Sequence, residues 1–147
     1  MRQKDDFSCA PVAIRNWIKK TSFSKLPKNL LEDITFLLDT DEDGTDPDCY
    51  MSLIRVIAAM CEDKVTTYDS WNLTKTHELR WGSGIFLEYV DSTDDEHIAY
   101  ADFDFQKQHW NVYNSQIIVN GRMKQKFTTD EINSLILETD GKIHGVK

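Results

Sequence analysis

The chain carries the segment SCAPVAIRNWIKK at residues Ser8 to Lys20, and the expected fold follows from it. Its apolar residues recur at helical offsets, at Ala10, Ala13, Ile14 and Trp17. That spacing is typical of an amphipathic helix that buries one face. Pro11 suits the first turn, where its missing N–H has no helical partner, and two lysines suit the last turn. The segment therefore predicts a helix that carries Cys9 at its start.

Two further helices are expected in the first half of the chain. One spans about Lys28 to Leu38, and its apolar face consists of Leu30, Leu31, Ile34, Leu37 and Leu38. The other begins at Asp46-Pro47, since aspartate is a good cap and proline a good first helical residue. Its residues at helical spacing are Tyr50, Leu53, Ile54, Ile57 and Cys61. Cys61 is therefore expected to face the core.

After Asp63 the pattern becomes that of strands. The expected strands are Val65 to Tyr68, Ile85 to Val90, His97 to Phe105, His109 to Tyr113 and Ile117 to Val119. Asn120-Gly121 is a hairpin signal that leads into Arg122 to Phe127, which favours antiparallel neighbours. Thr128 and Glu131 form a capping box for a last helix through about Glu138. Helices followed by antiparallel strands predict an α+β fold, and the absence of repeats and linkers predicts a single domain over residues 1–147.

Composition narrows the classes of partner and the cellular compartment. The net charge of −8 should repel a phosphate backbone, so nucleic acid is not an expected partner. The longest apolar runs are only a few residues and no secretion signal is visible, so no membrane association is expected. Three cysteines fit reduced thiols better than a disulfide framework. These features favour the cytoplasm.

Cys9 is the candidate nucleophile because a helix N-terminus lowers the pKa of a thiol. Gln3 lies upstream, where its side-chain amide and the Cys9 backbone N–H would stabilise an oxyanion. His97 begins a strand after the acidic loop Asp91 to Glu96 and is the candidate base, with His109 as a rival. Asn114 ends the next strand, and its side-chain oxygen is the expected acceptor for the imidazole, with Asn111 the weaker candidate.

The order of these residues resembles the papain-like cysteine peptidases, in particular the bacteriocin-processing peptidase domains of ABC exporters. QKDDFSCAPVAIRNWI is similar to that family's Gln and its Cys-Gly-Pro/Ala segment. GTDPDCYMSLIRVIAAM, GIFLEYV, HIAYADF and WNVYNSQ follow in the family's order. The resemblance covers roughly residues 3 to 118 and implies a papain-like fold with Cys9, His97 and Asn114 as a triad and Gln3 beside it. Ala10 departs from the family's glycine, and Asn114-Ser115 resembles papain-type enzymes more than the Asp-Pro of the exporter domains.

Three functions are compatible with this pattern. The leading hypothesis is hydrolysis of a peptide or amide bond in a protein or peptide substrate through a thioester intermediate. The same residues would serve an acyltransferase, of the transpeptidase or transglutaminase type, if an amine or thiol replaced water. The third hypothesis is a binding module that lost turnover, which is motivated by Ala10 and by the acidic charge.

Metal sites and cofactors are not expected. The run Asp39, Asp41, Asp43 and Gly44 resembles the first half of a calcium-binding loop, but Pro47 takes its ninth place and Tyr50 its twelfth, where a bidentate glutamate is needed. A solvated acidic loop is the better interpretation. The cysteines and histidines show no spacing typical of a zinc site.

Overall fold

The computed structural model describes residues 9–21, 33–34, 47–61, 63, 65–69 and 84–146. Within these ranges the chain combines helices with an antiparallel sheet, which confirms the α+β class. The helices are α1 (Cys9–Thr21), α3 (Pro47–Met60) and α5 (Thr129–Glu138). Of the helix expected over residues 28–38, only residues 33 and 34 are described, and both are helical. None of the described helices is long and apolar enough to cross a membrane.

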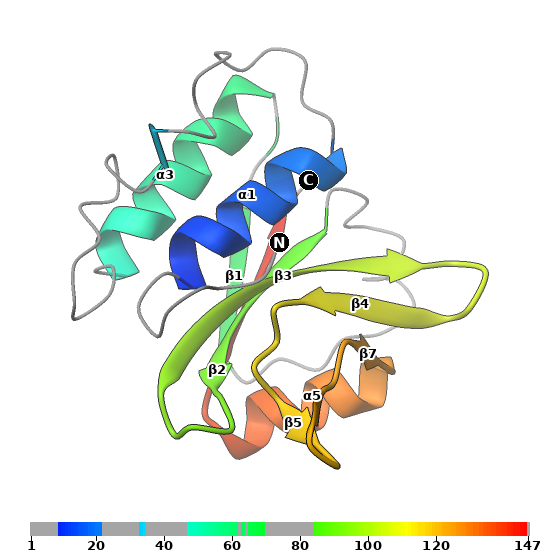
Figure 1. The fold of residues 1–147 in the computed structure, drawn as a ribbon. Helices are drawn as coiled ribbons and strands as arrows, with labels where there is room; N and C mark the ends of the chain where they lie inside the picture. The colour runs from blue at the N-terminus through cyan, green and yellow to red at the C-terminus, as the bar shows by residue number, and fades with distance from the viewer. Residues whose placement is uncertain are drawn as a thin grey trace.

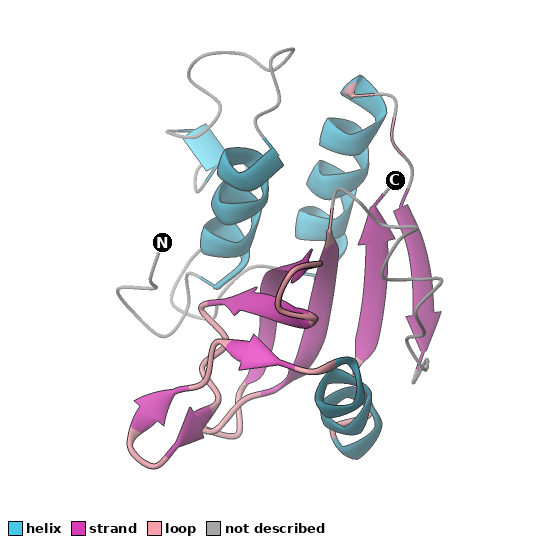
Figure 2. Cartoon of the chain, turned by 90° about the vertical axis from the view of Figure 1, so that its right-hand side faces the viewer, coloured by secondary structure: helices cyan, strands magenta, loops and turns pink. Residues whose placement is uncertain are grey.

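In the described part of the chain the main sheet has six strands, all paired antiparallel. Its order is β1 (Val65–Asp69), β8 (Lys142–Val146), β2 (Ile85–Val90), β3 (Glu96–Asp104), β4 (His109–Tyr113) and β7 (Lys126–Phe127). A separate hairpin pairs β5 (Ile118–Val119) with β6 (Arg122–Met123). The views in Figures 1 and 2 agree in placing α1 and α3 on one side of the main sheet and α5 on the other.

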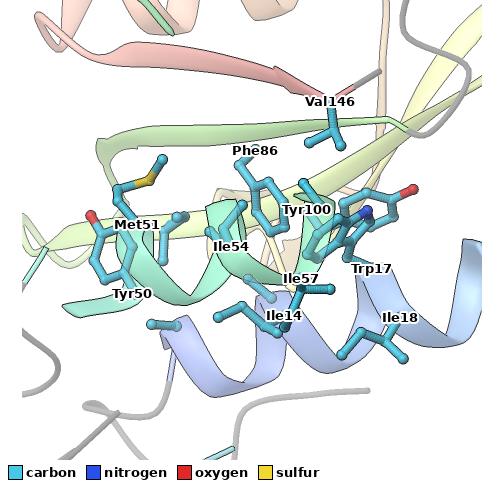
Figure 3. Packing of buried hydrophobic residues seen from close by; sticks show 14 of the residues in the cluster. Ile14, Trp17, Ile18, Tyr50, Met51, Ile54, Ile57, Phe86, Tyr100 and Val146 are labelled. Carbon is cyan, nitrogen blue, oxygen red and sulfur yellow. The ribbon is translucent and has the colours of Figure 1, made fainter. Parts of the chain in front are cut away.

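The strands β2 and β3 are buried on both faces, so their side chains divide between two cores. Phe86 and Tyr100 face α1 and α3, whereas Leu87 and Ala99 face α5. In the first core the ring of Phe86 meets the edge of Trp17 at a centroid distance of 5.2 Å and lies 5.6 Å from Tyr100 (Figure 3). This packing fixes α1 against the middle of the sheet.

Several expected elements are confirmed at or within a residue of their expected bounds. The strands β2 and β4 have the expected bounds, and α5 ends at Glu138 with both hydrogen bonds of the capping box present. Asn120 and Gly121 both have positive φ, 53° and 76°, as a two-residue hairpin turn requires. The helix α3 begins at Pro47 as expected but ends at Met60, so Cys61 lies half-buried in the turn beyond it.

Two features differ from the expected strands. The strand expected from Arg122 to Phe127 is split, because the chain leaves its hairpin partner after Met123 and pairs with β4 from Lys126. The strand β8 was not expected at all, yet it lies between β1 and β2 in the main sheet.

Candidate functional site

Cys9 is the first residue of α1, and its sulfur lies against the beginning of β3. The backbone N–H groups of Ile98 and Ala10 bond the sulfur, and the N–H of Cys9 itself also favours the charged form of the thiol. Burial nevertheless has the larger effect and raises the pKa of the Cys9 thiol above its ordinary value, in spite of these backbone donors. The expected net lowering of this pKa by the helix N-terminus is therefore wrong, because desolvation outweighs the backbone donors.

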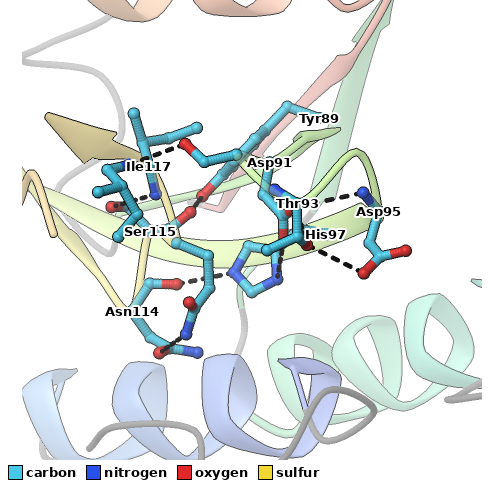
Figure 4. Close-up of polar contacts among 11 residues, drawn as sticks. Tyr89, Asp91, Thr93, Asp95, His97, Asn114, Ser115 and Ile117 are labelled. Atoms are coloured by element: carbon cyan, nitrogen blue, oxygen red, sulfur yellow. Dashed lines mark hydrogen bonds and ion pairs between the residues drawn. The ribbon is translucent and has the colours of Figure 1, made fainter. Parts of the chain in front are cut away.

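His97 is the second residue of β3 and is almost completely buried. Its Nε2 lies 2.7 Å from the backbone carbonyl oxygen of Asn114, and its Nδ1 lies 3.9 Å from Oδ2 of Asp91 (Figure 4). Burial lowers the pKa of His97, while the Asn114 carbonyl and the Asp91 charge act in the opposite direction. Among the described residues no hydrogen bond joins the Cys9 sulfur to the imidazole.

Asn114 bonds His97 through its main chain and not through the side chain that the sequence favoured. It follows the last residue of β4 with a left-handed φ of 58°, which turns its carbonyl oxygen toward the imidazole. The side-chain oxygen instead accepts a hydrogen bond of 2.9 Å from Nε2 of Gln116. The imidazole is thus bonded by the backbone oxygen of Asn114 and not by the expected side-chain oxygen, because the positive φ of Asn114 directs its carbonyl group at the ring.

The weaker candidates lie together on β4, away from this contact. Asn111 donates to Oδ1 of Asp102 at 3.2 Å, and its side-chain oxygen lies 3.1 Å from Nε2 of His109. Gln3 lies outside the described residues, as does the expected acidic loop at residues 39–46. Within the described ranges no three potential ligand side chains gather into a metal site.

Asp91 is a member of the site that sequence reasoning missed. Its Oδ1 accepts hydrogen bonds from the Thr93 N–H at 2.9 Å, the Thr93 hydroxyl at 2.7 Å and the Asp95 N–H at 3.2 Å. These bonds fold residues 91–95 into a tight turn just before His97. The turn itself could have been predicted from the sequence, since an aspartate side chain readily bonds the backbone N–H two residues further on.

Tyr89 supports the imidazole from β2. Tyr89 and His97 are register partners in the sheet, and their rings meet edge to face at 5.5 Å. The Tyr89 hydroxyl donates to the backbone carbonyl of Ser115, so it also holds the segment that follows Asn114. No local sequence pattern predicts this contact, because it depends on the pairing of two strands.

A second buried polar cluster consists of Tyr50, Glu88 and His144. Nε2 of His144 on β8 lies 2.5 Å from Oε1 of Glu88 on β2, and the Tyr50 hydroxyl of α3 also bonds Glu88. Burial alone would raise the pKa of Glu88, but the bonds to His144 and Tyr50 reverse the effect and lower it. The cluster ties α3 to the centre of the sheet beside α1.

Compared with models of known protein families the chain matches none, and no curated protein matches it either. The chemistry of the site is therefore inferred from its own geometry.

Proposed function

We propose that the protein is a papain-like cysteine hydrolase that cleaves a peptide or amide bond, with Cys9 as nucleophile and His97 as base. The observation that carries the proposal is the hydrogen bond from the Ile98 N–H to the Cys9 sulfur. Because Ile98 directly follows His97, this contact brings the thiol to the strand end that bears the imidazole. A thiol at a helix N-terminus beside an oriented histidine is the arrangement that nucleophilic acyl transfer uses.

The proposed reaction needs only groups of this site and water. As the sulfur attacks the carbonyl carbon, the thiol proton passes to His97, and backbone N–H groups near Cys9 stabilise the oxyanion. His97 then protonates the leaving amine as the carbon–nitrogen bond breaks, which leaves a thioester on Cys9. Water then attacks the thioester carbon while His97 accepts one of its protons. The carbon–sulfur bond breaks, His97 returns the proton to the sulfur, and the acid leaves while the Cys9 thiol is restored.

The pKa directions define how the activity should depend on pH. Burial raises the pKa of the Cys9 thiol and lowers the pKa of His97, so the resting pair is neutral. The proton then moves during the attack, and His97 must be neutral to receive it. Activity should rise with pH through a pKa below the ordinary value of histidine.

The test is the rate of iodoacetamide labelling of each cysteine between about pH 5 and 9, a range that spans the ordinary pKa values of histidine and cysteine. Cys49 is exposed and Cys61 half-buried, so both serve as internal controls within the same molecule. The proposal expects a component of Cys9 labelling that follows the titration of His97 and is lost in His97→Ala. The labelling of Cys49 should not change in that variant.

A substrate assay completes the test with a matched variant. Any amide-bond cleavage by the wild-type protein should be abolished in Cys9→Ala and retained in Cys49→Ala. Equal turnover in Cys9→Ala would exclude this mechanism. The masses of the products distinguish addition of water from transfer of the acyl group to an amine.

A non-catalytic binding module is the second candidate, and the neutral resting pair favours it. A raised thiol pKa makes Cys9 a poor nucleophile unless His97 assists. This candidate expects Cys9 to label more slowly than Cys49 at every pH, with no change in His97→Ala. The same experiment therefore separates the two functions.

A further inference from the structure

The tautomer of His97 follows from its hydrogen bond to Asn114. A backbone carbonyl oxygen only accepts hydrogen bonds, so the ring nitrogen facing it has to carry a proton. That nitrogen is Nε2, 2.7 Å from the Asn114 oxygen. A neutral imidazole carries one N–H, which leaves the lone pair on Nδ1. Nδ1 is therefore the atom that would accept a proton from the thiol.

The carboxylate of Asp91 is the charged group beside this nitrogen. Its Oδ2 lies 3.9 Å from Nδ1, and the two side chains are only 7% and 2% exposed. Water is thus largely excluded, and the interaction of the two groups is screened less than at the surface. The other carboxylate oxygen accepts the three hydrogen bonds from Thr93 and Asp95, which fix the orientation of Oδ2.

The effect of Asp91 differs between the two states of the imidazole. In the neutral state the Nδ1 lone pair faces a negative oxygen, which is unfavourable. After Nδ1 has gained a proton the same geometry becomes an attraction between opposite charges. Among the described residues, the titratable groups nearest His97 besides Asp91 include the Tyr89 phenol on β2, the adjacent Glu96, and the Cys9 thiol, whose sulfur bonds the Ile98 N–H. Burial raises the pKa of Tyr89 and of Cys9, and the Asp91 charge adds to both shifts.

We propose that Asp91 is a positioning residue, whose buried carboxylate stabilises the protonated His97 at Nδ1, while the main-chain carbonyl of Asn114 holds the proton on Nε2. The proposal rests on the function proposed above, because the catalytic role of Nδ1 depends on Cys9 as nucleophile. The sequence predicted that the Asn114 side chain alone orients His97. Here the carboxylate of Asp91, before β3, and the backbone oxygen of Asn114, after β4, share that role. Asp91 acts only through His97 and does not contact the substrate.

The first experiment is an NMR titration of the His97 ring in the full chain, which does not require activity. Asp91→Asn removes the charge but keeps an oxygen that accepts from Thr93, so the turn should be preserved. This variant should lower the pKa of His97. Asp95→Asn is the matched control, because it removes an equal charge from the same turn at an exposed side chain bonded to the Thr93 hydroxyl at 2.9 Å. It should leave the pKa of His97 nearly unchanged.

Equal His97 titrations in the wild type and Asp91→Asn would overturn the role of Asp91. If that variant does not fold, the wild type still tests the proposal, since the ring 15N shifts must report a proton on Nε2 and the titration on Nδ1. A neutral tautomer protonated at Nδ1 would refute it. Asn114→Gly retains both the carbonyl and the left-handed φ of 58°, so it should keep the tautomer. Loss of the tautomer in this variant would show that the Asn114 side chain, and not its carbonyl group, holds the proton on Nε2.

The labelling of Cys9 then separates this inference from the proposed function. In Asp91→Asn the histidine-dependent component of labelling should shift to lower pH together with the NMR titration. A shift of the His97 pKa with an unreactive Cys9 would support the role of Asp91 and contradict the hydrolase. A reactive Cys9 whose pH profile is identical in Asp91→Asn would support the hydrolase and contradict the role of Asp91.

Discussion

Gly141 is a position where a single added methyl group should disturb the main sheet. It lies between the end of α5 and β8, and its N–H donates to the Ile136 carbonyl at 2.8 Å. A Cβ added there would lie 2.1 Å from the backbone oxygen of Glu88, whereas ordinary contact begins at 3.4 Å. The backbone of β2 or β8 would have to move by about 1.3 Å, the difference between these two distances.

The expected cost of Gly141→Ala is at the upper end for overpacking, about 3 kcal/mol, because the neighbour is the backbone of a buried strand. For a domain of this size that loss corresponds to a decrease in Tm of about 10 °C. Gly121→Ala is the matched control. Its Cβ would meet nothing within 4 Å, so only its φ of 76° opposes the change. That strain should cost about 1 kcal/mol.

Urea unfolding followed by tryptophan fluorescence measures both variants, since Trp17 and Trp110 are fully buried. At low urea concentration each variant should have the same tryptophan fluorescence as the native wild-type protein. If Gly141→Ala loses no more free energy of unfolding than Gly121→Ala, the close approach of Gly141 to β2 is refuted. The position of β8 in the sheet would then be in doubt as well.

Two further predictions concern the polar cluster around Glu88 and the capping box of α5. Glu88→Gln should cost about 1–2 kcal/mol near neutral pH, because it removes the charge that accepts from His144 and Tyr50. The pKa of Glu88 is lowered in the folded state, so its stabilisation is complete above the ordinary pKa of glutamate and is lost as pH falls through the lowered pKa. The free energy of unfolding of the variant should therefore fall less steeply toward acidic pH than that of the wild type. An equally steep fall in both proteins would contradict the cluster. Thr128→Ala removes the side-chain cap that accepts from the Glu131 N–H, which should cost about 1 kcal/mol. An unchanged urea midpoint in Thr128→Ala would show that the capping box does not contribute to stability.

The helices and most strands were predictable because their signals are local. The apolar spacing of α1, the proline at the start of α3 and the capping box of α5 each depend on residues within a few positions of one another. The hairpin at Asn120 was predictable for the same reason, since its two positive φ angles favour asparagine and glycine. These signals specify elements but not their neighbours.

The strand β8 was not predictable because it depends on contacts that are distant in sequence. The segment KIHGV begins with lysine and contains glycine, which are both depleted in strands. It becomes a strand because β1 and β2 supply partners on either side. Asp91 was missed for a related reason. It belongs to a run of acidic residues typical of a solvated loop, and only the fold buries its carboxylate beside His97.

The conformation of Asn114 connects both halves of the candidate site. The strand β4 pairs with β3 only from Tyr100 onward, where Tyr100 faces Tyr113. Because Asn114 then turns the chain with a positive φ, Ser115 leaves the edge of β3, and its carbonyl accepts from Tyr89 instead. The edge of β3 before Tyr100, at residues 96–99, is thereby free of β4, and the Ile98 N–H bonds the Cys9 sulfur.

The same turn directs the Asn114 carbonyl at His97, so one backbone angle both admits the thiol to the strand edge and fixes the imidazole tautomer. A residue that disfavours positive φ should impair both contacts together, whatever hydrogen bonds its side chain can form. Asn114→Val is therefore expected to weaken the histidine-dependent labelling of Cys9 far more than Asn114→Gly, although neither variant retains the amide. If the two variants behave alike, the side-chain amide and not the backbone turn organises the site.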